Sequence, residues 1–351
     1  MTKKTAFTKL AKPTHNMRIR LLTHTDADGE IPAIILKLLF KDVTVKHCSN
    51  GTMDCDIRTA ILGENADDYD MTFITDISCS KDTAHDINEM LFKESDNPRK
   101  IVLLDHHPSA DYLNKCDWAC VEPKIITDSY RARYYNDLAN AHSSAASLVY
   151  DYFDYIGWFD TVPSFQNNLL QTLVHYVASY DTWDWSDVFG RRYMEMYQID
   201  KLHEMYGDDI FEESFLRKLK TFPAKIFDDT DMTILRAHEA RLKRHLSKTD
   251  ECVLTGRWII DNTAYDVAYT DNTDFLNETA DYLRGKYPDV DLIITNYGTG
   301  LSVRTPKSDI DVGKILAKIG GGGHPGAGGC KIKRAEIINS IAASTGTSLL
   351  L

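Results

Sequence analysis

The sequence IVLLDHHP, residues 101–108, joins an apolar run directly to one acidic and two imidazole side chains, Asp105, His106 and His107. A short apolar run bounded by polar residues is typical of a fully buried strand. In open parallel sheets, ligands bind outside the carboxyl ends of the strands. The stretch therefore predicts a central strand and, directly after it, the first candidate site residues.

Similar runs on both sides of this stretch predict an α/β fold. Further strand-like runs lie at residues 18–24, 43–47 and 71–75. A helix is predicted to begin near Glu30, with Pro32 in its first turn, where a missing amide hydrogen costs no helical bond. A second helix is predicted over 82–93. Strands that alternate with helices indicate a largely parallel sheet covered by helices on its faces.

The order of these elements divides the 351 residues into two domains with a connector. Residues 1–189 hold the parallel sheet and its helices. Residues 190–250 are rich in charge and in helix formers, which predicts a helical connector. Strands return in residues 251–351, which predicts a smaller α/β domain. Composition leaves open whether the connector shapes the interdomain cleft, caps the active site or forms the contact of a homodimer.

The net charge of −12 argues against a protein that binds long duplex nucleic acid, because such affinity comes mainly from Lys and Arg side chains that neutralise phosphates. A short anionic substrate held by metal ions remains compatible with it. The seven cysteines form no CxxC pair, which predicts free thiols in a reducing compartment. Neither a signal peptide nor an apolar run long enough to span a membrane is found, so a soluble, cytoplasmic protein is expected.

The first candidate metal ligands are His24, Asp26 and Asp28 in the sequence HTDADG. Side chains two residues apart on an extended segment point the same way, so an imidazole and two carboxylates can converge on a metal ion. A divalent cation would also relieve the repulsion between the two acids. The alternative is a polar turn with solvated acids.

Two further acids each end a predicted element. Asp76 follows the apolar run at 71–75, and Asp181 ends a predicted helix in the sequence YDTWDW. Taken alone, each is an ordinary turn former or helix terminus. Asp76 is a stronger candidate than its residue type suggests, because the other strands of the predicted sheet are also followed by His and Asp. Asp184 competes with Asp181 for any role.

Asp105, His106 and His107 cannot all bind one metal, since neighbouring side chains on an extended segment diverge. The sensible division is one histidine as a ligand, the acid to orient it or balance its charge, and the other histidine toward the substrate. Ser143 and Ser144 precede another predicted helix. They are candidate N-cap residues, with amide donation to a phosphate oxygen as the alternative.

The segments HTDADG, TD, DHH and YDTWDW, in this order over residues 24–185, resemble the four motifs of the DHH phosphoesterase superfamily. The segment GGGGHPGAGG, residues 320–329, resembles the signature of the DHHA1 substrate-binding domain. The resemblance covers residues 17–345, apart from the connector. The HTDADG form is more similar to the short-RNA exonucleases called B-type nano-RNases than to the branch with the NPDxDxxG motif. RecJ-type DNA exonucleases share both parts but are usually longer, with an added nucleic-acid-binding domain, and inorganic pyrophosphatases carry a different second domain without GGGGH.

This resemblance implies two divalent cations, usually Mn²⁺, with Mg²⁺ as the alternative. Mixed imidazole and carboxylate ligands suit Mn²⁺ better than Mg²⁺. The implied ligands of one cation are His24, Asp26 and Asp76, and those of the other are Asp28, Asp76, His106 and Asp181. Asp105 would support the ring of His106, and His107 would lie toward the scissile phosphate.

In the DHHA1-like domain, the resemblance implies that His324 and Arg304 contact the nucleotide. Asn296 is a weaker candidate. The backbone could also approach an anion closely at three glycines, Gly321, Gly322 and Gly323.

The implied activity is hydrolysis of short single-stranded oligonucleotides to nucleoside 5′-monophosphates by metal-activated water. Three alternatives remain open. They are a phosphodiesterase for cyclic or linear signalling dinucleotides, a RecJ-like single-stranded DNA exonuclease, and a non-catalytic nucleotide-binding protein.

Overall fold

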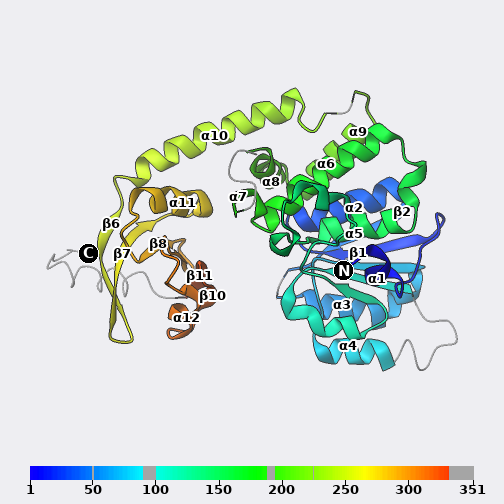
Figure 1. Cartoon of the computed structure of the whole chain (residues 1–351), viewed down its shortest axis with the longest axis horizontal. Helices are drawn as coiled ribbons and strands as arrows, with labels where there is room; N and C mark the ends of the chain where they lie inside the picture. The colour runs from blue at the N-terminus through cyan, green and yellow to red at the C-terminus, as the bar shows by residue number, and fades with distance from the viewer. Residues whose placement is uncertain (50, 90–99, 188–193, 224, 332–351) are drawn as a thin grey trace. The chain divides into compact units, whose positions relative to one another are not determined.

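The computed structural model describes residues 1–331 except 50, 90–99, 188–193 and 224 (Figure 1). This part of the chain forms two compact units, Met1–Leu235 and Arg236–Leu351, of which the second is described as far as residue 331. The predicted α/β class with two domains is confirmed. No helix in the described residues is both long enough and apolar enough to cross a membrane. All seven cysteines are free, as predicted.

The first unit is built on a five-stranded sheet in the order β2-β1-β3-β4-β5, with every neighbouring pair parallel. Its strands are β1 (Arg18–Thr23), β2 (Asp42–His47), β3 (Met71–Thr75), β4 (Lys100–Asp105) and β5 (Ala119–Val121). The chain order reverses at β1, which lies between β2 and β3. In such sheets the crevice at this switch point, outside the carboxyl ends of the strands, is where ligands bind.

The described chain up to residue 249 contains ten helices, of which the first nine belong to the first unit and the tenth crosses the boundary between the units. They are α1 (Lys3–Phe7), α2 (Ala27–Leu39), α3 (Met53–Leu62), α4 (Lys81–Asn88), α5 (Ala145–Tyr155), α6 (Ser164–Asp181), α7 (Asp184–Asp187), α8 (Met194–Tyr206), α9 (Asp208–Leu219) and α10 (Asp229–Thr249). Short 3₁₀ helices lie at Glu64–Asp68, Pro108–Lys115, Tyr130–Tyr134, Leu138–Asn140 and Trp158–Thr161.

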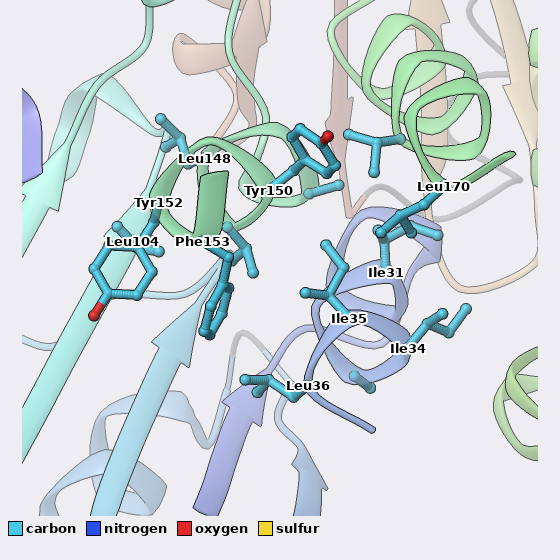
Figure 2. Close-up of a cluster of buried hydrophobic side chains, with 14 of the residues drawn as sticks. Ile31, Ile34, Ile35, Leu36, Leu104, Leu148, Tyr150, Tyr152, Phe153 and Leu170 are labelled. Carbon is cyan, nitrogen blue, oxygen red and sulfur yellow. The ribbon is translucent and has the colours of Figure 1, made fainter. Parts of the chain in front are cut away.

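Both faces of the sheet are covered, which explains why β1, β3, β4 and β5 are almost wholly buried, whereas the edge strand β2 alternates exposed and half-buried residues. On one face, strand residues such as Phe73 and Leu104 pack with α2, α5 and α6 in the larger core. Figure 2 shows Ile31 and Ile35 of α2 and Phe153 of α5 within this core. On the other face, a second cluster joins the strands to α3 and α4 (Figure 1).

Helix α2 begins earlier than predicted, at Ala27 rather than near Glu30. The carboxylate of Asp26 is the N-cap and accepts a hydrogen bond from the amide of Gly29 at 3.0 Å. Pro32 therefore lies in the second turn and not in the first. Because proline has no amide hydrogen, the carbonyl of Asp28 loses its helical partner at this position.

The segment predicted as a connector is divided between the two units. Helices α8 and α9 bury Ile199, Leu202, Phe211 and Phe215 in the larger core of the first unit. The boundary between units consequently lies within α10, at residue 235, and not at residue 189. The physical reason is the apolar face of these two helices, which their high overall charge concealed in the sequence.

The second unit is a six-stranded sheet in the order β10-β11-β9-β8-β7-β6, parallel only between β7 and β8. Its strands are β6 (Leu254–Ile260), β7 (Thr263–Asp271), β8 (Leu292–Asn296), β9 (Leu301–Arg304), β10 (Gly322–His324) and β11 (Ala327–Cys330), and its further helices are α11 (Leu276–Lys286) and α12 (Val312–Ala317). The glycine-rich segment thus forms an antiparallel hairpin.

Candidate metal centre

Five of the six predicted metal ligands follow the carboxyl ends of β1, β3 and β4, at the switch point of the sheet, and the sixth, Asp181, is the last residue of α6. His24 and Asp26 lie between β1 and α2, and Asp28 lies in the first turn of α2. Asp76 follows β3, and His106 follows β4. Because β1 pairs with β3 and β3 with β4, the parallel register places these three turns side by side.

One group of potential ligands consists of His24, Asp26 and Asp76, whose ligand atoms all lie within 4.8 Å of one another. Nδ1 of His24 lies 2.7 Å from Oδ2 of Asp26 and 4.0 Å from Oδ2 of Asp76. Burial opposes ionisation of Asp26, but its hydrogen bonds with His24 and with the amide of Gly29 prevail and lower its pKa to about 2. Asp26 is therefore a carboxylate at neutral pH.

A second group consists of Asp28, His106 and Asp181, again with all ligand atoms within 4.8 Å. Nε2 of His106 lies 3.8 Å from Oδ2 of Asp28 and 3.6 Å from Oδ2 of Asp181. Burial lowers the pKa of His106, which keeps its ring neutral. A neutral imidazole is the form that binds a metal ion.

Asp76 lies between the two groups and turns one oxygen to each. Its Oδ2 is the atom near His24, while its Oδ1 lies 3.2 Å from Nε2 of His106. Its backbone adopts a φ of +60°, in the left-handed region that a short polar residue tolerates. Burial, followed by repulsion from Asp28, Asp26 and Asp181, raises the pKa of Asp76 well above its usual value.

Asp28 is held by the start of α5. The amides of Ala145 and Ala146 donate hydrogen bonds to its two carboxylate oxygens at 2.7 and 3.1 Å. Ser144 is the N-cap of α5, as predicted, and forms a capping box with Ser147. The amides of Ser143 and Ser144, considered as donors to a phosphate oxygen, instead donate to the carbonyl oxygen of Pro123 at 3.1 Å and to Oγ of Ser147 at 2.9 Å.

Asp105 supports His107 and not the ring of His106, which corrects the sequence-based expectation. Its Oδ1 lies 2.8 Å from Nδ1 of His107 and also accepts the backbone amide hydrogens of His106 and His107 at 2.8 and 3.3 Å. The reason is the tight turn after β4, which folds the second histidine back over the acid. Oδ2 of Asp105 is buried and has no hydrogen-bond partner in the described chain.

The competing acid, Asp184, belongs to no ligand group among the described residues. It is buried, accepts the hydroxyl hydrogen of Tyr135 at 2.8 Å and pairs with Nδ1 of His142 at 3.0 Å. Its carboxylate therefore fastens the segment before α5 to the start of α7.

A pocket of about 410 Å³ adjoins the first ligand group through Asp26. Its lining residues are Thr25, Asp26, Asp200, His203, Glu204, Gly207 and Asp208. Four of these residues are acids, so the pocket repels a phosphate unless cations lie beside it.

Divalent cations fit this donor set. The cluster holds several carboxylates in a buried space, and their mutual repulsion is visible in the raised pKa of Asp76. The orphaned Oδ2 of Asp105 adds negative potential at the same place. Mixed oxygen and imidazole donors are those of divalent transition metals such as Mn²⁺.

Asp76, Asp105, His106 and His107 also form a group with ligand atoms within 4.8 Å of one another, so the prediction that the last three cannot face one metal is wrong. A fourth group, which no sequence motif indicated, consists of Glu30, His47 and Asp208. Nε2 of His47 lies 2.8 Å from Oε2 of Glu30, and its Nδ1 lies 3.7 Å from Oδ2 of Asp208. Burial raises the pKa of Glu30 to about 7. His47 ends β2, so only its place at a strand end could have drawn attention to it.

In the second unit, the predicted substrate-binding residues lie on the sheet. Arg304 ends β9 and donates a hydrogen bond to Oδ1 of Asn277 at 3.0 Å. Asn296 is buried and donates to Oδ1 of Asp271 at 2.7 Å. The side chain of His324 lies outside the described residues.

The three predicted glycines lie in β10 or directly before it, and two of them have no room for a side chain. A Cβ at Gly321 would lie 2.5 Å from Cβ of Cys330, and one at Gly323 would lie 2.3 Å from the carbonyl oxygen of Ala327. A Cβ at Gly322 would meet no atom within 4 Å. Of the three, Gly322 is the position open to a ligand.

The chain was compared with family models, with curated proteins and with solved structures. No family model matches it. Oligoribonuclease NrnB of Bacillus subtilis (strain 168) is 28% identical over 320 residues, which cover 89% of this chain and 72% of that protein. The predicted resemblance to DHH-superfamily oligoribonucleases is confirmed.

Two solved structures are also similar to this chain. The pGpG-specific phosphodiesterase PggH from Vibrio cholerae is 16% identical with a TM-score of 0.43, covering 93% of this chain and 100% of that one. Exonuclease RecJ bound to manganese is 16% identical with a TM-score of 0.44, covering 98% and 92%.

Proposed function

We propose that the protein is a phosphodiesterase that uses two divalent cations to hydrolyse short oligoribonucleotides to nucleoside 5′-monophosphates. The similarity to NrnB supports the class of the enzyme, a metal-dependent phosphoesterase. The geometry of the ligand cluster and the charge of the chain support the number of cations and the length of the substrate.

One observation carries the proposal of two cations. The carboxylate of Asp76 turns Oδ2 to His24 and Oδ1 to His106, so that one side chain serves two separate ligand groups. In the proposed assignment, His24, Asp26 and Asp76 hold the first cation. Asp28, Asp76, His106 and Asp181 hold the second. The imidazoles favour Mn²⁺ over Mg²⁺ as the occupant.

Cations bound by these residues would activate a water molecule and balance the charge that develops on the phosphate during in-line displacement. Residues of the chain hold the metal ligands in position and provide a group that can exchange a proton with the substrate. The N-terminus of α5 holds Asp28 in place. Asp105 holds Nδ1 of His107, whose side chain is about half exposed, and so leaves Nε2 to exchange a proton with the substrate.

The preference for short substrates follows from the charge. A net charge of −12 and an acid-lined pocket beside Asp26 provide little attraction for the many phosphates of a long strand. A substrate with one or two phosphates can instead be bound by the cations and a few side chains.

The test is hydrolysis of labelled substrates by pure protein with Mn²⁺. Diribonucleotides should be cleaved to nucleoside monophosphates faster than a long RNA or DNA single strand, and addition of EDTA should stop the reaction. Rapid attack on the long strand with no cleavage of dinucleotides would contradict the proposal. Preferential hydrolysis of a cyclic dinucleotide would assign the protein to signalling dinucleotides instead.

A further inference from the structure

The C-terminal half of α10 carries a row of basic side chains that the ligand cluster does not use. Arg241, Arg244 and Lys248 are three and four residues apart, so they share one face of the helix, and all three are exposed. Like charges at these spacings destabilise a helix by about 0.2–0.5 kcal/mol per pair. Helix stability therefore does not explain why these three cations lie on one face.

The structure shows no ion pair between these three cations and any acid in the part of the chain that it describes. Six other cations of the same unit are paired with acids. Ion pairs with acids hold Arg257, Arg284, Lys286, Lys307, Lys314 and Lys318. In a chain with a net charge of −12, unpaired cations concentrated on one helix face are suited to bind an external anion.

The row lines a pocket of about 260 Å³, which we call the basic pocket. Its lining residues are Arg241, Arg244, His245, Lys248, Asp274 and Phe275. His245 and Asp274 also line a neighbouring pocket of about 480 Å³, whose wall includes Asn296. The basic pocket thus adjoins a residue that the sequence had already indicated as a nucleotide contact.

Phe275, which lines the basic pocket, has a strained backbone conformation. Its φ of +52° lies in the left-handed region, where a bulky residue is strained by about 1–3 kcal/mol. The ring lies 5.3 Å from that of His238 and 5.2 Å from that of His245, and the guanidinium of Arg241 lies 5.6 Å from its centroid. Such strain persists mainly at functional positions.

Cations that follow a phosphate backbone and an aromatic ring beside them are the usual components of a groove for single-stranded nucleic acid. We propose that the basic pocket binds a phosphate of the oligonucleotide substrate, with the attached nucleoside against Phe275. This inference rests on the proposed function and adds to it a substrate contact on the second unit. Because the contact is separate from the ligand cluster, it should affect binding and not the chemical step.

The test compares the double variant Arg244→Ala/Lys248→Ala with Lys243→Ala. Lys243 is an exposed cation on the same helix that does not line the pocket, so it controls for the effect of removing a positive charge from this helix elsewhere than at the pocket. The double variant should raise KM for a short oligoribonucleotide by about tenfold or more, with kcat within about twofold, since a charge-assisted phosphate contact is lost. The dependence of log affinity on log salt should become shallower by about 1–2.

Fluorescence anisotropy with the same labelled oligonucleotide, in EDTA, provides a readout that needs no turnover. The wild type and Lys243→Ala should bind it more tightly than the double variant. If the wild type binds the oligonucleotide in EDTA but does not cleave it in Mn²⁺, the proposed function fails while the pocket stands. Equal binding by wild type and double variant, or no binding by the wild type, would overturn the pocket.

Discussion

Asp181 and Asp184 lie three residues apart, yet only Asp181 reaches the ligand cluster. Oδ2 of Asp181 lies 3.6 Å from Nε2 of His106, whereas Asp184 is buried against Tyr135 and His142. Between the two acids, Trp183 adopts a φ of +66°, which turns the chain and separates the directions of the carboxylates. The two acids should therefore respond differently to the same substitution.

Asp181→Asn should lower hydrolysis by about 100-fold or more, because a ligand of the second proposed cation is lost. Without metal, its free energy of unfolding should stay within about 0.5 kcal/mol of the wild type or rise, since one of several repelling carboxylates is removed. A hydrolysis assay with Mn²⁺ measures the first property, and urea unfolding without metal measures the second.

Asp184→Asn should instead lower the free energy of unfolding by about 1–3 kcal/mol, because buried hydrogen bonds lose their charged acceptor. It should keep the additional stability that Mn²⁺ gives to the wild type. A stable Asp184→Asn protein that no longer responds to Mn²⁺ would reverse the assignment of the two acids.

Gly323→Ala should destabilise the second unit, while Gly322→Ala should not. Gly323 has a φ of +147° and no room for a Cβ beside the carbonyl oxygen of Ala327. The expected loss is about 2 kcal/mol or more from strain and overlap together. Thermal unfolding of both variants checks this, and equal stability would show that the hairpin tolerates a side chain at either position.

Acid should destabilise the protein through His175. Burial, followed by the charges of Arg131 and Arg133, lowers the pKa of His175 to about 2, and its ring is stacked on that of Tyr134 at 3.9 Å. The unfolded chain binds a proton near pH 6.5 while the folded chain does not, so the stability present above pH 6.5 is lost as the pH falls.

His175→Phe keeps a stacking ring and removes this titration. Between pH 6.5 and 5.5 the wild type should lose about 1 kcal/mol more free energy of unfolding than the variant. Urea titrations at the two pH values provide the comparison. Parallel losses in both proteins would show that His175 is protonated in the folded state.

The parallel sheet and the places of His24, Asp76 and His106 could be predicted, because apolar runs that end in polar residues report both the strands and their carboxyl ends. The hydrogen-bond partner of Asp105 could not be predicted. It depends on the φ and ψ angles of a two-residue turn, which spacing does not determine. Nor could the sequence show that the amides of α5 bind Asp28, a contact across more than a hundred residues.

Larger features were missed for different reasons. Helices α8 and α9 were assigned to a connector because their charge outweighs their apolar residues in composition, although Ile199 and Phe211 are fully buried. The hairpin of β10 and β11 is rich in glycine, which has low strand propensity, and tertiary pairing with β9 overrides that tendency. The basic pocket required Phe275 and α10 to be brought together by the fold.

The central claim is that Asp76 is shared by two cations. Asp76→Asn is the variant that isolates this role, because asparagine tolerates the φ of +60° that would strain alanine. The substitution removes the charge and keeps the shape of the side chain. Metal-free Asp76→Asn should be at least as stable as the wild type, since a buried carboxylate repelled by its neighbours has gone.

The direct measurement is the rate of diribonucleotide hydrolysis as a function of Mn²⁺ concentration for the wild type and Asp76→Asn, with unfolding followed in the same samples. The wild-type rate should rise from zero with Mn²⁺, while that of the folded variant should stay about 100-fold lower or more at every concentration. A folded Asp76→Asn protein with near-normal turnover would contradict the account.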